Sequence, residues 1–547
     1  MSFSPLKPPV FAPDIVLPEL VLPAVLPDDV DALKALLQQL HGAHQAALVA
    51  VKEQVTREAH DYIIRMVEQA KLARHRMFGS SSEQLTAQGR LFDEAEALAL
   101  SSTDAGDIAP IPADPTGGEK KPAKSVRGKR SALPAGLERV DVVYAVPESE
   151  RTCPCGTPMI EIGQDVSEQL DIVPMQVRVL RHIRKRYACA DGGRAPLTAA
   201  MPPQPLPKTN ASINFLAMLL VLKFVDGLPL ARIEHVLARH GVVVPRQTLA
   251  RWVIAAARLL QPLHNLMRDI LLDAPFIHMD ETVVQVLKET GKAATSNSYM
   301  WVQTGGPPDR PIVIYDYDPS RSGEVPARLL QGYKGYLMTD GYDGYNQLIR
   351  NEEIIHLACF AHVRRRFVDA VRVQPKGKRG KADEAVTLIG KLYGIERDCK
   401  DASDEVRLHA RQQFSVPALA ALHDWMEATL PGVTPSSALG TALAYMKKYW
   451  SRLTRYTERG DLPIDNNRVE NSIRPFVVGR KGWLFSDTPA GAHSSAVIYS
   501  LMQTAKANGK EPYAWLCNVL HDLPAAKSVD DVELLLPWNL HRLNLTS

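Results

Sequence analysis

The sequence predicts a multidomain α/β protein whose strand-rich core is interrupted by a helical insertion. A chain of 547 residues is too long for one compact core, so several folded units are expected. After Leu271 the pattern changes from helical to a series of short strands, and from Ala382 to Tyr456 it is helical again. Hydrophobic residues make up 45% of the chain, which is enough to fill such cores and excludes wholesale disorder.

The N-terminal quarter is expected to contain an arm, a coiled coil and a linker. Residues 1–28 are rich in proline and lack periodicity, which predicts an irregular arm. In residues 29–100 a four-three spacing favours a coiled-coil dimerisation segment and hence a homodimer, although a helix packed on its own chain has the same pattern. The positions of this spacing are Leu37, Leu40, His44, Ala47 and Val51. Residues 101–135 have little apolar content, which predicts a flexible basic linker.

A short cysteine motif marks the next segment, residues 136–208. The motif consists of Cys153, Cys155 and Cys189. A tetrahedral zinc site needs four sulfur or nitrogen ligands, usually from two cysteine pairs, and here one pair is incomplete. The segment is therefore predicted to be zinc-ribbon-like, with Zn²⁺ completed by His182 or Asp191, or with a fold that survives without metal.

Residues 209–270 are expected to be a helical DNA-binding domain of the helix-turn-helix type. One helix begins at Pro229 and ends before Gly241, and a second begins at Pro245. The outward positions at the start of the second helix are Arg246, Gln247 and Arg251. These are the positions that a recognition helix presents to the major groove, although pairs of packed helices also occur in proteins that never contact DNA.

Basic residues are clustered, whereas the acidic residues are spread along the chain. The clusters lie at residues 120–130, 178–186, 364–366 and 376–381. One such run usually forms a solvated face, but four of them favour a polyanionic partner, and double-stranded DNA is the leading candidate. The longest apolar run, residues 215–222, is too short to span a membrane, and six scattered cysteines do not form a disulfide framework. We therefore expect a cytoplasmic protein without a membrane partner.

The strand-rich part, residues 271–366, has an order of elements that matches a ribonuclease-H-like sheet. Strands are expected at residues 276–287, 299–304, 311–317, 336–339 and 354–360, with a helix at 325–330 between the third and fourth strands. In such a sheet the first strand lies beside the end of the fourth, which would bring Asp280 and Asp340 within reach of one metal ion. Mg²⁺ prefers carboxylate ligands, so a third carboxylate is expected from a later helix.

Four ordered motifs then carry a resemblance to a known family. They are HMDET at 278–282, TDGY at 339–342, CFAHVRR at 359–365 and DNNRVENSIRP at 465–475. From about Met77 to Asn539 the chain resembles the insertion-sequence-66 family of bacterial transposases. The resemblance implies an Asp-Asp-Glu triad of Asp280, Asp340 and Glu470, which would bind two Mg²⁺ or Mn²⁺ ions. Glu281 is the rival first-strand carboxylate, but strand alternation should direct it to the opposite face.

The position of Glu470 predicts how the chain after residue 366 is divided into domains. The long interval between Asp340 and Glu470 predicts a helical insertion at residues 367–460, and residues 461–520 then form the second part of the core, followed by a C-terminal tail at 521–547. Further candidates for contact with DNA are Arg364, Arg365, Arg474, Arg480 and Lys481, with Trp483 as a stacking surface or a core residue.

Cys359 and His362 have a spacing that could suggest a metal hook. They have no matching second pair of ligands, so we expect core packing for both.

The function expected from these features is that of a transposase. It would bind the terminal inverted repeats of an insertion sequence, cleave the DNA ends and transfer the 3′-hydroxyl ends to target DNA. Its partners would be transposon ends, target DNA and accessory proteins encoded by the same element, in the nucleoid of a bacterium. The alternatives are a non-catalytic helix-turn-helix regulator and a nuclease that cuts without joining.

Overall fold

The computed structural model describes residues 29–78, 176–187, 197–350, 353–374 and 379–539. Apart from residues 176–179, these belong to one compact unit of the chain. The expected arm, the basic linker and all three cysteines of the zinc-ribbon-like segment lie outside the described residues. No helix in the described ranges is both long enough and apolar enough to cross a membrane.

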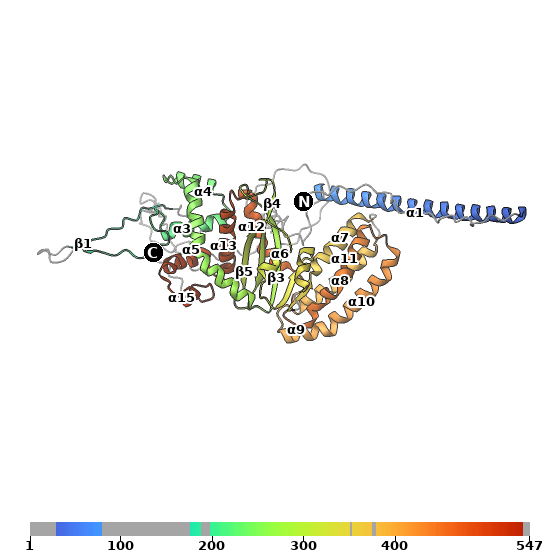
Figure 1. Ribbon diagram of the computed structural model, residues 1–547. Coiled ribbons are helices and arrows are strands. Elements are labelled where there is room, and N and C mark those ends of the chain that lie inside the picture. The colour runs from blue at the N-terminus through green and yellow to red at the C-terminus, as the bar shows by residue number, and fades with distance from the viewer. Residues whose placement is uncertain (1–28, 79–175, 188–196, 351–352, 375–378, 540–547) are drawn as a thin grey trace, which may run out of the picture. The chain divides into compact units, whose positions relative to one another are not determined.

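Helix α1, Val30–Phe78, is one uninterrupted helix of 49 residues within the segment where a coiled coil is expected (Figure 1). Several of its large apolar side chains are exposed, including Leu37, Ile63 and Met66. Leu37 and His44 belong to the spacing that favours a coiled coil and are exposed, whereas Leu40, Ala47 and Val51 are half-buried in this single chain. Dimerisation through α1 stays a prediction.

A mixed five-stranded sheet with the order β5-β4-β3-β6-β7 forms the centre of the unit. Its strands are β3 (Phe276–Gln285), β4 (Asn297–Gly305), β5 (Ile312–Asp318), β6 (Gly335–Thr339) and β7 (Ile354–Ala358). The first three are antiparallel neighbours, whereas β6 and β7 run parallel to β3. All five predicted strands are confirmed with small shifts at their ends, and their order is consistent with a ribonuclease-H-like core. Helix α6 (Glu324–Leu329) lies between β5 and β6, and the 3₁₀ segment η2 (Asp343–Arg350) follows β6.

The outer edge of β5 is closed by helix α13, Pro489–Ala507. The Val313 amide donates to Thr504 Oγ1 at 3.0 Å, and the Tyr315 amide donates to Ser500 Oγ at 2.7 Å. Side-chain hydroxyls thus satisfy backbone donors that another strand would otherwise pair with. This explains why a sheet edge can lie in the core of the unit.

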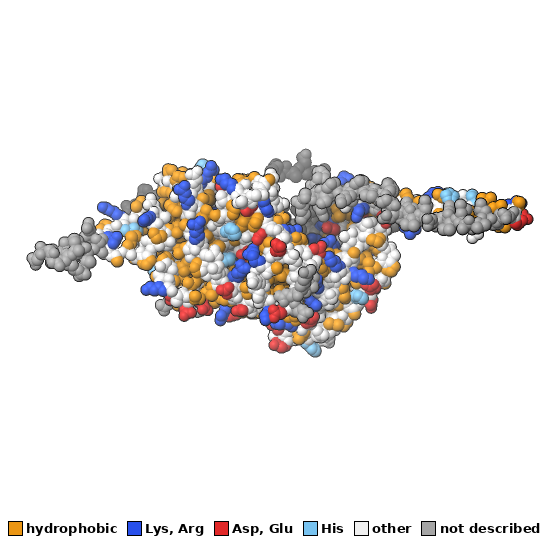
Figure 2. All heavy atoms as spheres, in the orientation of Figure 1, with side chains coloured by type: hydrophobic (Ala, Val, Ile, Leu, Met, Phe, Trp, Pro, Cys, Tyr) orange, Lys and Arg blue, Asp and Glu red, His pale blue; other side chains and the backbone are white. Residues whose placement is uncertain are grey.

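The predicted pair of helices in residues 209–270 is present, but its second helix also belongs to the core. Helix α3 (Ile213–Phe224) precedes α4 (Leu230–Arg239), and α5 (Arg246–Leu272) follows a turn at Gly241, which has φ +75°. Figure 2 shows Lys and Arg side chains around α4 and α5. One face of α5 is buried along the helix, from Leu249 to Leu271, and His264 Nε2 on this face lies 3.3 Å from the Tyr315 carbonyl of β5.

The C-terminal residues pack on the same unit as far as Asn539. Helix α12 (Asn467–Trp483) is followed by α13, α14 (Pro512–Asp522) and the short α15 (Val529–Glu533). Trp515 Nε1 donates to the Leu535 carbonyl at 3.2 Å, and Leu536 is fully buried. The segment predicted as a tail is therefore folded over most of its length, because these apolar side chains complete the core.

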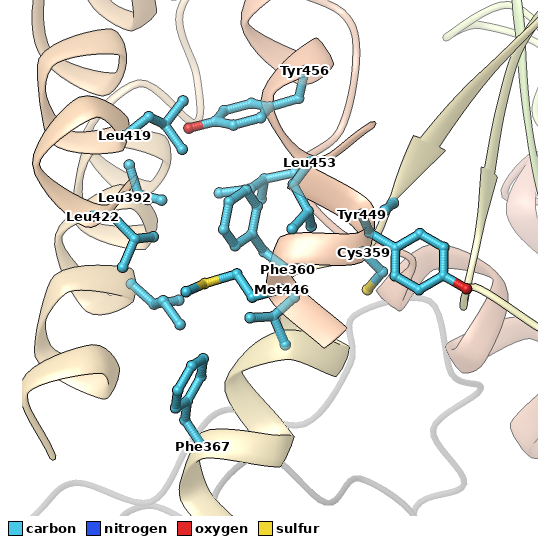
Figure 3. Close-up of a cluster of buried hydrophobic side chains, with 14 of the residues drawn as sticks. Cys359, Phe360, Phe367, Leu392, Leu419, Leu422, Met446, Tyr449, Leu453 and Tyr456 are labelled. Atoms are coloured by element: carbon cyan, nitrogen blue, oxygen red, sulfur yellow. The ribbon is translucent and has the colours of Figure 1, made fainter. Parts of the chain in front are cut away.

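The helical insertion is a helical bundle with its own apolar core. Its helices are α7 (Phe360–Val373), α8 (Lys381–Asp398), α9 (Asp404–Ala410), α10 (Val416–Thr429) and α11 (Ala438–Thr454). Phe367, Leu422 and Met446 meet between these helices (Figure 3). The bundle begins directly after β7, so the boundary expected at residue 367 falls inside α7.

Candidate active site

Parallel pairing of β3 and β6 brings Asp280 and Asp340 to the same place in the sheet. The last paired residues are His278 and Met338, and each aspartate lies two residues beyond its own strand's member of that pair. Asp340 follows directly after Thr339, where β6 ends. The expected juxtaposition of the two aspartates is therefore built into the sheet.

Asp280 is a half-buried carboxylate among other carboxylates. Burial raises its pKa well above the usual range, and the negative charges of Glu281, Asp340 and Glu470 raise it further. The Glu281 amide, which donates to Asp280 Oδ1 at 2.8 Å, opposes this rise only in part. All four carboxylates thus share one electrostatic neighbourhood, which favours a bound proton or a bound cation.

Glu470 lies in the first turn of α12 and contacts helix α7. Arg365 Nη2 donates to Glu470 Oε2 at 3.4 Å, and His362 Nε2 lies 3.8 Å from Oε1. The Oε1 atom is buried and has no hydrogen-bond donor. Such an atom is costly unless a donor or a cation reaches it.

Asn466 fixes the start of α12 against the sheet, and sequence reasoning missed this role. Its side chain pairs with His278 Nδ1 at 2.9 Å and donates to the Met279 carbonyl at 3.2 Å. The backbone N–H of Asn466 donates to Cys359 Sγ at 3.1 Å. Asn466 therefore joins β3, beside Asp280, to the helix that carries Glu470. Burial lowers the pKa of His278 to about 4, so this histidine is neutral when it pairs with Asn466.

Glu281 has partners of its own, although the sequence made it the rival of Asp280. Its side chain is only 1% exposed. Arg321 Nε donates to Oε1 at 2.7 Å, and the Tyr345 hydroxyl donates to Oε2 at 2.8 Å. The Arg321 guanidinium in turn stacks on Tyr342, 3.9 Å from the ring centroid. Both oxygens of Glu281 are thus engaged, which leaves Asp280 as the better available ligand.

Cys359 and His362 differ in their surroundings. Cys359 is fully buried, and burial raises the pKa of its thiol to about 12, so the packing role expected for it is confirmed. His362 instead faces Glu470, and its Nδ1 atom is buried without a hydrogen-bond partner. Burial lowers the pKa of His362, while Glu470 opposes that shift. His362 is half-buried at the start of the insertion, so the packing role expected for it stays a prediction, to which the approach to Glu470 is added.

Comparison with known families decides what kind of protein carries this site. The family model described as Transposase IS66 family matches residues 208–494, which is just over half of the chain. The chain belongs to the IS66 transposase family. Three further models of the same family match residues 65–142 (Transposase C of IS166 homeodomain), 150–191 (zinc-finger binding domain of transposase IS66) and 500–538 (IS66 C-terminal element). The resemblance of the four motifs is thereby confirmed.

Relatives of this IS66 transposase include three uncharacterized proteins of Sinorhizobium fredii (strain NBRC 101917 / NGR234). Protein y4jD is 33% identical over 460 residues, which cover 80% of this chain and 88% of the relative. Protein y4qI is 30% identical over 543 residues, or 95% of this chain and 99% of the relative. Protein y4hP is 30% identical over 434 residues, or 76% and 78%. The matches extend well beyond the motifs and cover between 76% and 95% of this chain.

The remaining residues expected to contact DNA fall into two groups in this IS66 transposase. Near the carboxylates, Arg365 contacts Glu470, and the half-buried Arg480 points Nη1 toward Thr282 Oγ1 on β3, 3.4 Å away. Arg364 and Arg474 are half-buried, and Lys481 is exposed. The second group, Arg246, Gln247 and Arg251, is exposed at the start of α5.

Trp483 is half-buried at the end of α12. Its ring lies edge-on to Phe476 with centroids 5.4 Å apart, and the Lys223 ammonium is 5.6 Å from the Trp483 ring. These contacts favour the core role, and the stacking role stays a prediction.

Membership of the family implies DNA as partner and the use of a divalent metal. The zinc-finger match contains Cys153, Cys155 and Cys189, whose ligation of Zn²⁺ stays a prediction. Among the residues that the structure describes, no three His, Cys, Asp or Glu side chains converge closely enough to form a ready metal cage. The donor set nevertheless fits a hard divalent ion: burial and the neighbouring carboxylates raise the pKa of Asp280, and Glu470 Oε1 is a buried oxygen with no hydrogen-bond donor among the described residues.

Proposed function

We propose that Asp280, Asp340 and Glu470 are the catalytic triad of a DNA transposase with a ribonuclease-H-like core. The enzyme binds two Mg²⁺ or Mn²⁺ ions, cleaves the ends of its insertion sequence and transfers the 3′-hydroxyl ends to target DNA. The observation that carries this proposal is the register of the sheet, in which Asp280 and Asp340 each lie two residues beyond the last paired residues of β3 and β6. Asn466, at the start of the helix that carries Glu470, donates to the Met279 carbonyl beside Asp280. Burial raises the pKa of Asp280, and the charges of Glu281, Asp340 and Glu470 raise it further. Three half-buried acids would not be gathered for stability, since their charges repel.

In this mechanism the carboxylates of Asp280, Asp340 and Glu470 would hold the ions. The ions, when bound, would lower the pKa of the attacking water or 3′-hydroxyl and stabilise the leaving 3′-oxygen. Asp340 is oriented by the Tyr342 amide, which donates to its Oδ1 at 2.8 Å. Glu281 stays paired with Arg321, so it contributes charge to the site without acting as a ligand.

Arg365 serves both the carboxylate and the substrate. Its contact with Glu470 is 3.4 Å, long for a charge-assisted hydrogen bond, and its side chain is 48% exposed. With Glu470 as a metal ligand, the exposed Arg365 guanidinium would be available to bind a phosphate oxygen of the DNA and to compensate its charge.

Recognition of the DNA ends is assigned to parts of the chain outside the triad. The helices α4 and α5, with Arg246, Gln247 and Arg251, read the terminal inverted repeats, and α1 joins two copies. The zinc-ribbon-like segment binds Zn²⁺ through its cysteines and takes part in DNA binding.

The test is strand transfer in vitro. Labelled duplexes with the terminal sequences of the element that encodes the chain are mixed with a target plasmid and Mg²⁺ or Mn²⁺. Wild type is compared with Asp280→Asn, Asp340→Asn and Glu470→Gln, and with Asp269→Asn, an exposed carboxylate of α5, as the matched control.

Wild type and the control should join ends, whereas the three site variants should bind DNA without cutting it. Joining by the three variants at the wild-type rate would refute the triad. Nicking without joining would support a nuclease, and binding without cutting by wild type would support a regulator.

A further inference from the structure

Two tyrosines of the helical insertion hold the loop that carries Asp340. The Tyr445 hydroxyl donates to the Asp340 carbonyl at 2.6 Å, and the Tyr449 hydroxyl donates to the Gly341 carbonyl at 2.7 Å. The loop approaches α11 closely: Gly341 has φ +84°, and a Cβ atom there would lie 2.9 Å from the Tyr445 hydroxyl. The insertion is therefore bonded directly to the backbone of a candidate catalytic residue.

The faces of the same two rings carry cations. The Arg366 guanidinium lies 4.0 Å from the centroid of Tyr445, while Lys448 Nζ and the Arg452 guanidinium lie 5.1 and 5.5 Å from that of Tyr449. A ring orients a cation without cancelling its charge. These five residues form what we call the tyrosine–cation strip, in which Arg366 and Lys448 are exposed and Arg452 is half-buried.

Helix α11, which carries both tyrosines of the strip, is packed tightly against the bundle. On its other side α11 buries Leu443, Met446 and Leu453 almost completely in the core of the bundle. Figure 3 shows Tyr449 at the margin of this core, with its hydroxyl directed away from the aliphatic side chains. A displacement of the strip residues is therefore transmitted to the Asp340 loop through short, well-packed contacts.

The strip answers an electrostatic problem of the proposed site. Four carboxylates repel a phosphodiester, so cations beside them are needed to hold the DNA backbone. The strip begins at the Asp340 loop, and Arg366 is the chain neighbour of Arg365, which contacts Glu470. A polyanion lying on the strip therefore continues directly to the carboxylates.

We propose that the tyrosine–cation strip binds the phosphate backbone of the duplex being cut, beside the phosphodiester that enters the site, and that Tyr445 and Tyr449 couple this binding to the position of Asp340. This inference rests on the proposed function, because the duplex it names is the substrate of that site. The strip residues are positioning residues that act through the DNA and the loop.

Two adjacent lysines of α11 provide a matched test of binding. Lys448 is 55% exposed and paired with Asp343 at 2.9 Å, while Lys447 is 54% exposed and paired with Glu427 at 2.9 Å. Binding of a labelled random-sequence duplex is measured by fluorescence anisotropy without metal, over a series of salt concentrations. The slope of log K against log salt is negative, and each lost phosphate contact reduces its magnitude by about 0.9.

Lys448→Gln should reduce the magnitude of this slope by about one, and the double variant with Arg366→Gln should reduce it by about two in total. Lys447→Gln should leave the slope unchanged. Equal behaviour of the two lysines would overturn the inference. Cleavage of end DNA without target DNA identifies the bound duplex: Lys448→Gln should raise the KM for end DNA in this reaction. A defect confined to the joining step would assign the strip to target DNA and contradict the proposal.

Coupling is tested with Tyr445→Phe and Tyr449→Phe, which keep the rings and remove the hydroxyls. The salt slope and KM should stay unchanged, while kcat for end cleavage falls about fivefold for each lost hydrogen bond. Hydrogen–deuterium exchange of the peptide from β6 to η2 should slow on DNA binding in wild type and slow less in both variants. An unchanged kcat together with wild-type exchange would refute coupling.

The two proposals fail in distinguishable ways. If wild type cuts no DNA, the proposed function fails, and the salt slopes and exchange rates still decide whether the strip binds DNA. If wild type cuts but the slopes do not separate Lys448 from Lys447, this inference alone fails.

Discussion

Replacing Asp280 by asparagine is expected to stabilise the metal-free protein and to abolish most of its stabilisation by divalent ions. Burial and the charges of Glu281, Asp340 and Glu470 raise the pKa of Asp280 from its ordinary value of 3.8. Between the ordinary and the raised pKa the folded state binds more protons than the unfolded state. Stability therefore falls as pH rises through this window, and the full penalty is present above the raised pKa. Asparagine has nearly the same shape and carries no charge.

The expected change in the free energy of unfolding depends on how well the Asp280 carboxylate is compensated by hydrogen bonds and opposite charges. Glu281 and Glu470 each contact an arginine, whereas the one hydrogen bond found for the Asp280 carboxylate is from the Glu281 amide. Relief of a strained functional site typically adds about 0.5–2 kcal/mol to the free energy of unfolding. A divalent ion at a hundred times its Kd adds about 2.7 kcal/mol to wild type. The order of the two stabilities should therefore reverse when metal is added.

The assay is thermal unfolding of wild type, Asp280→Asn and the surface control Asp269→Asn, each with EDTA and with Mn²⁺. The variant should melt above wild type in EDTA and below it in Mn²⁺, with about 2–4 °C for each kcal/mol. The control should follow wild type in both conditions. A variant that melts below wild type in EDTA, or that gains as much from Mn²⁺, would refute the reasoning.

Three further predictions concern the support of the site and its pH dependence. Asn466→Ala removes the partner of the buried His278, and urea unfolding should show a loss of about 1–3 kcal/mol; a loss within error of zero would contradict the role of this residue. Arg411→Met leaves Glu396 without its 2.6 Å partner in the insertion, and the same method should show a loss of about 3–5 kcal/mol, with a neutral result as the contrary outcome. Mn²⁺ affinity, measured by calorimetry, should rise with pH as Asp280 loses its proton and should be flatter in Asp280→Asn; equal profiles would show that another group titrates.

The sheet was predictable from the sequence because its strands are short apolar runs bounded by turns. The order of those runs, with Asp280 inside the first and Asp340 after the fourth, is a local pattern that survives folding. The long helix α1 was predictable for the same reason, since no proline interrupts it. Glu470 could be predicted as the third carboxylate only from the family resemblance, because the long helical insertion separates it in sequence from the strands of the core.

The partners of the carboxylates were not predictable from spacing. Asn466 contacts His278 across 188 residues, and Arg321 contacts Glu281 across 40, so only the folded chain brings them together. The approach of His362 to Glu470 was not predictable either, because a histidine near the start of a helix has the same spacing whether it faces the core or the site. The extension of α5 into the core was missed since its periodicity matches both a recognition helix and a buried one.

The most direct test of the central claim is to locate Mn²⁺ by anomalous diffraction in crystals of the protein with bound end DNA. The proposed triad predicts ions bonded to oxygens of Asp280, Asp340 and Glu470, with Glu281 still paired to Arg321. Ions bonded to Glu281 in place of Asp280, or ions that do not touch Glu470, would contradict it.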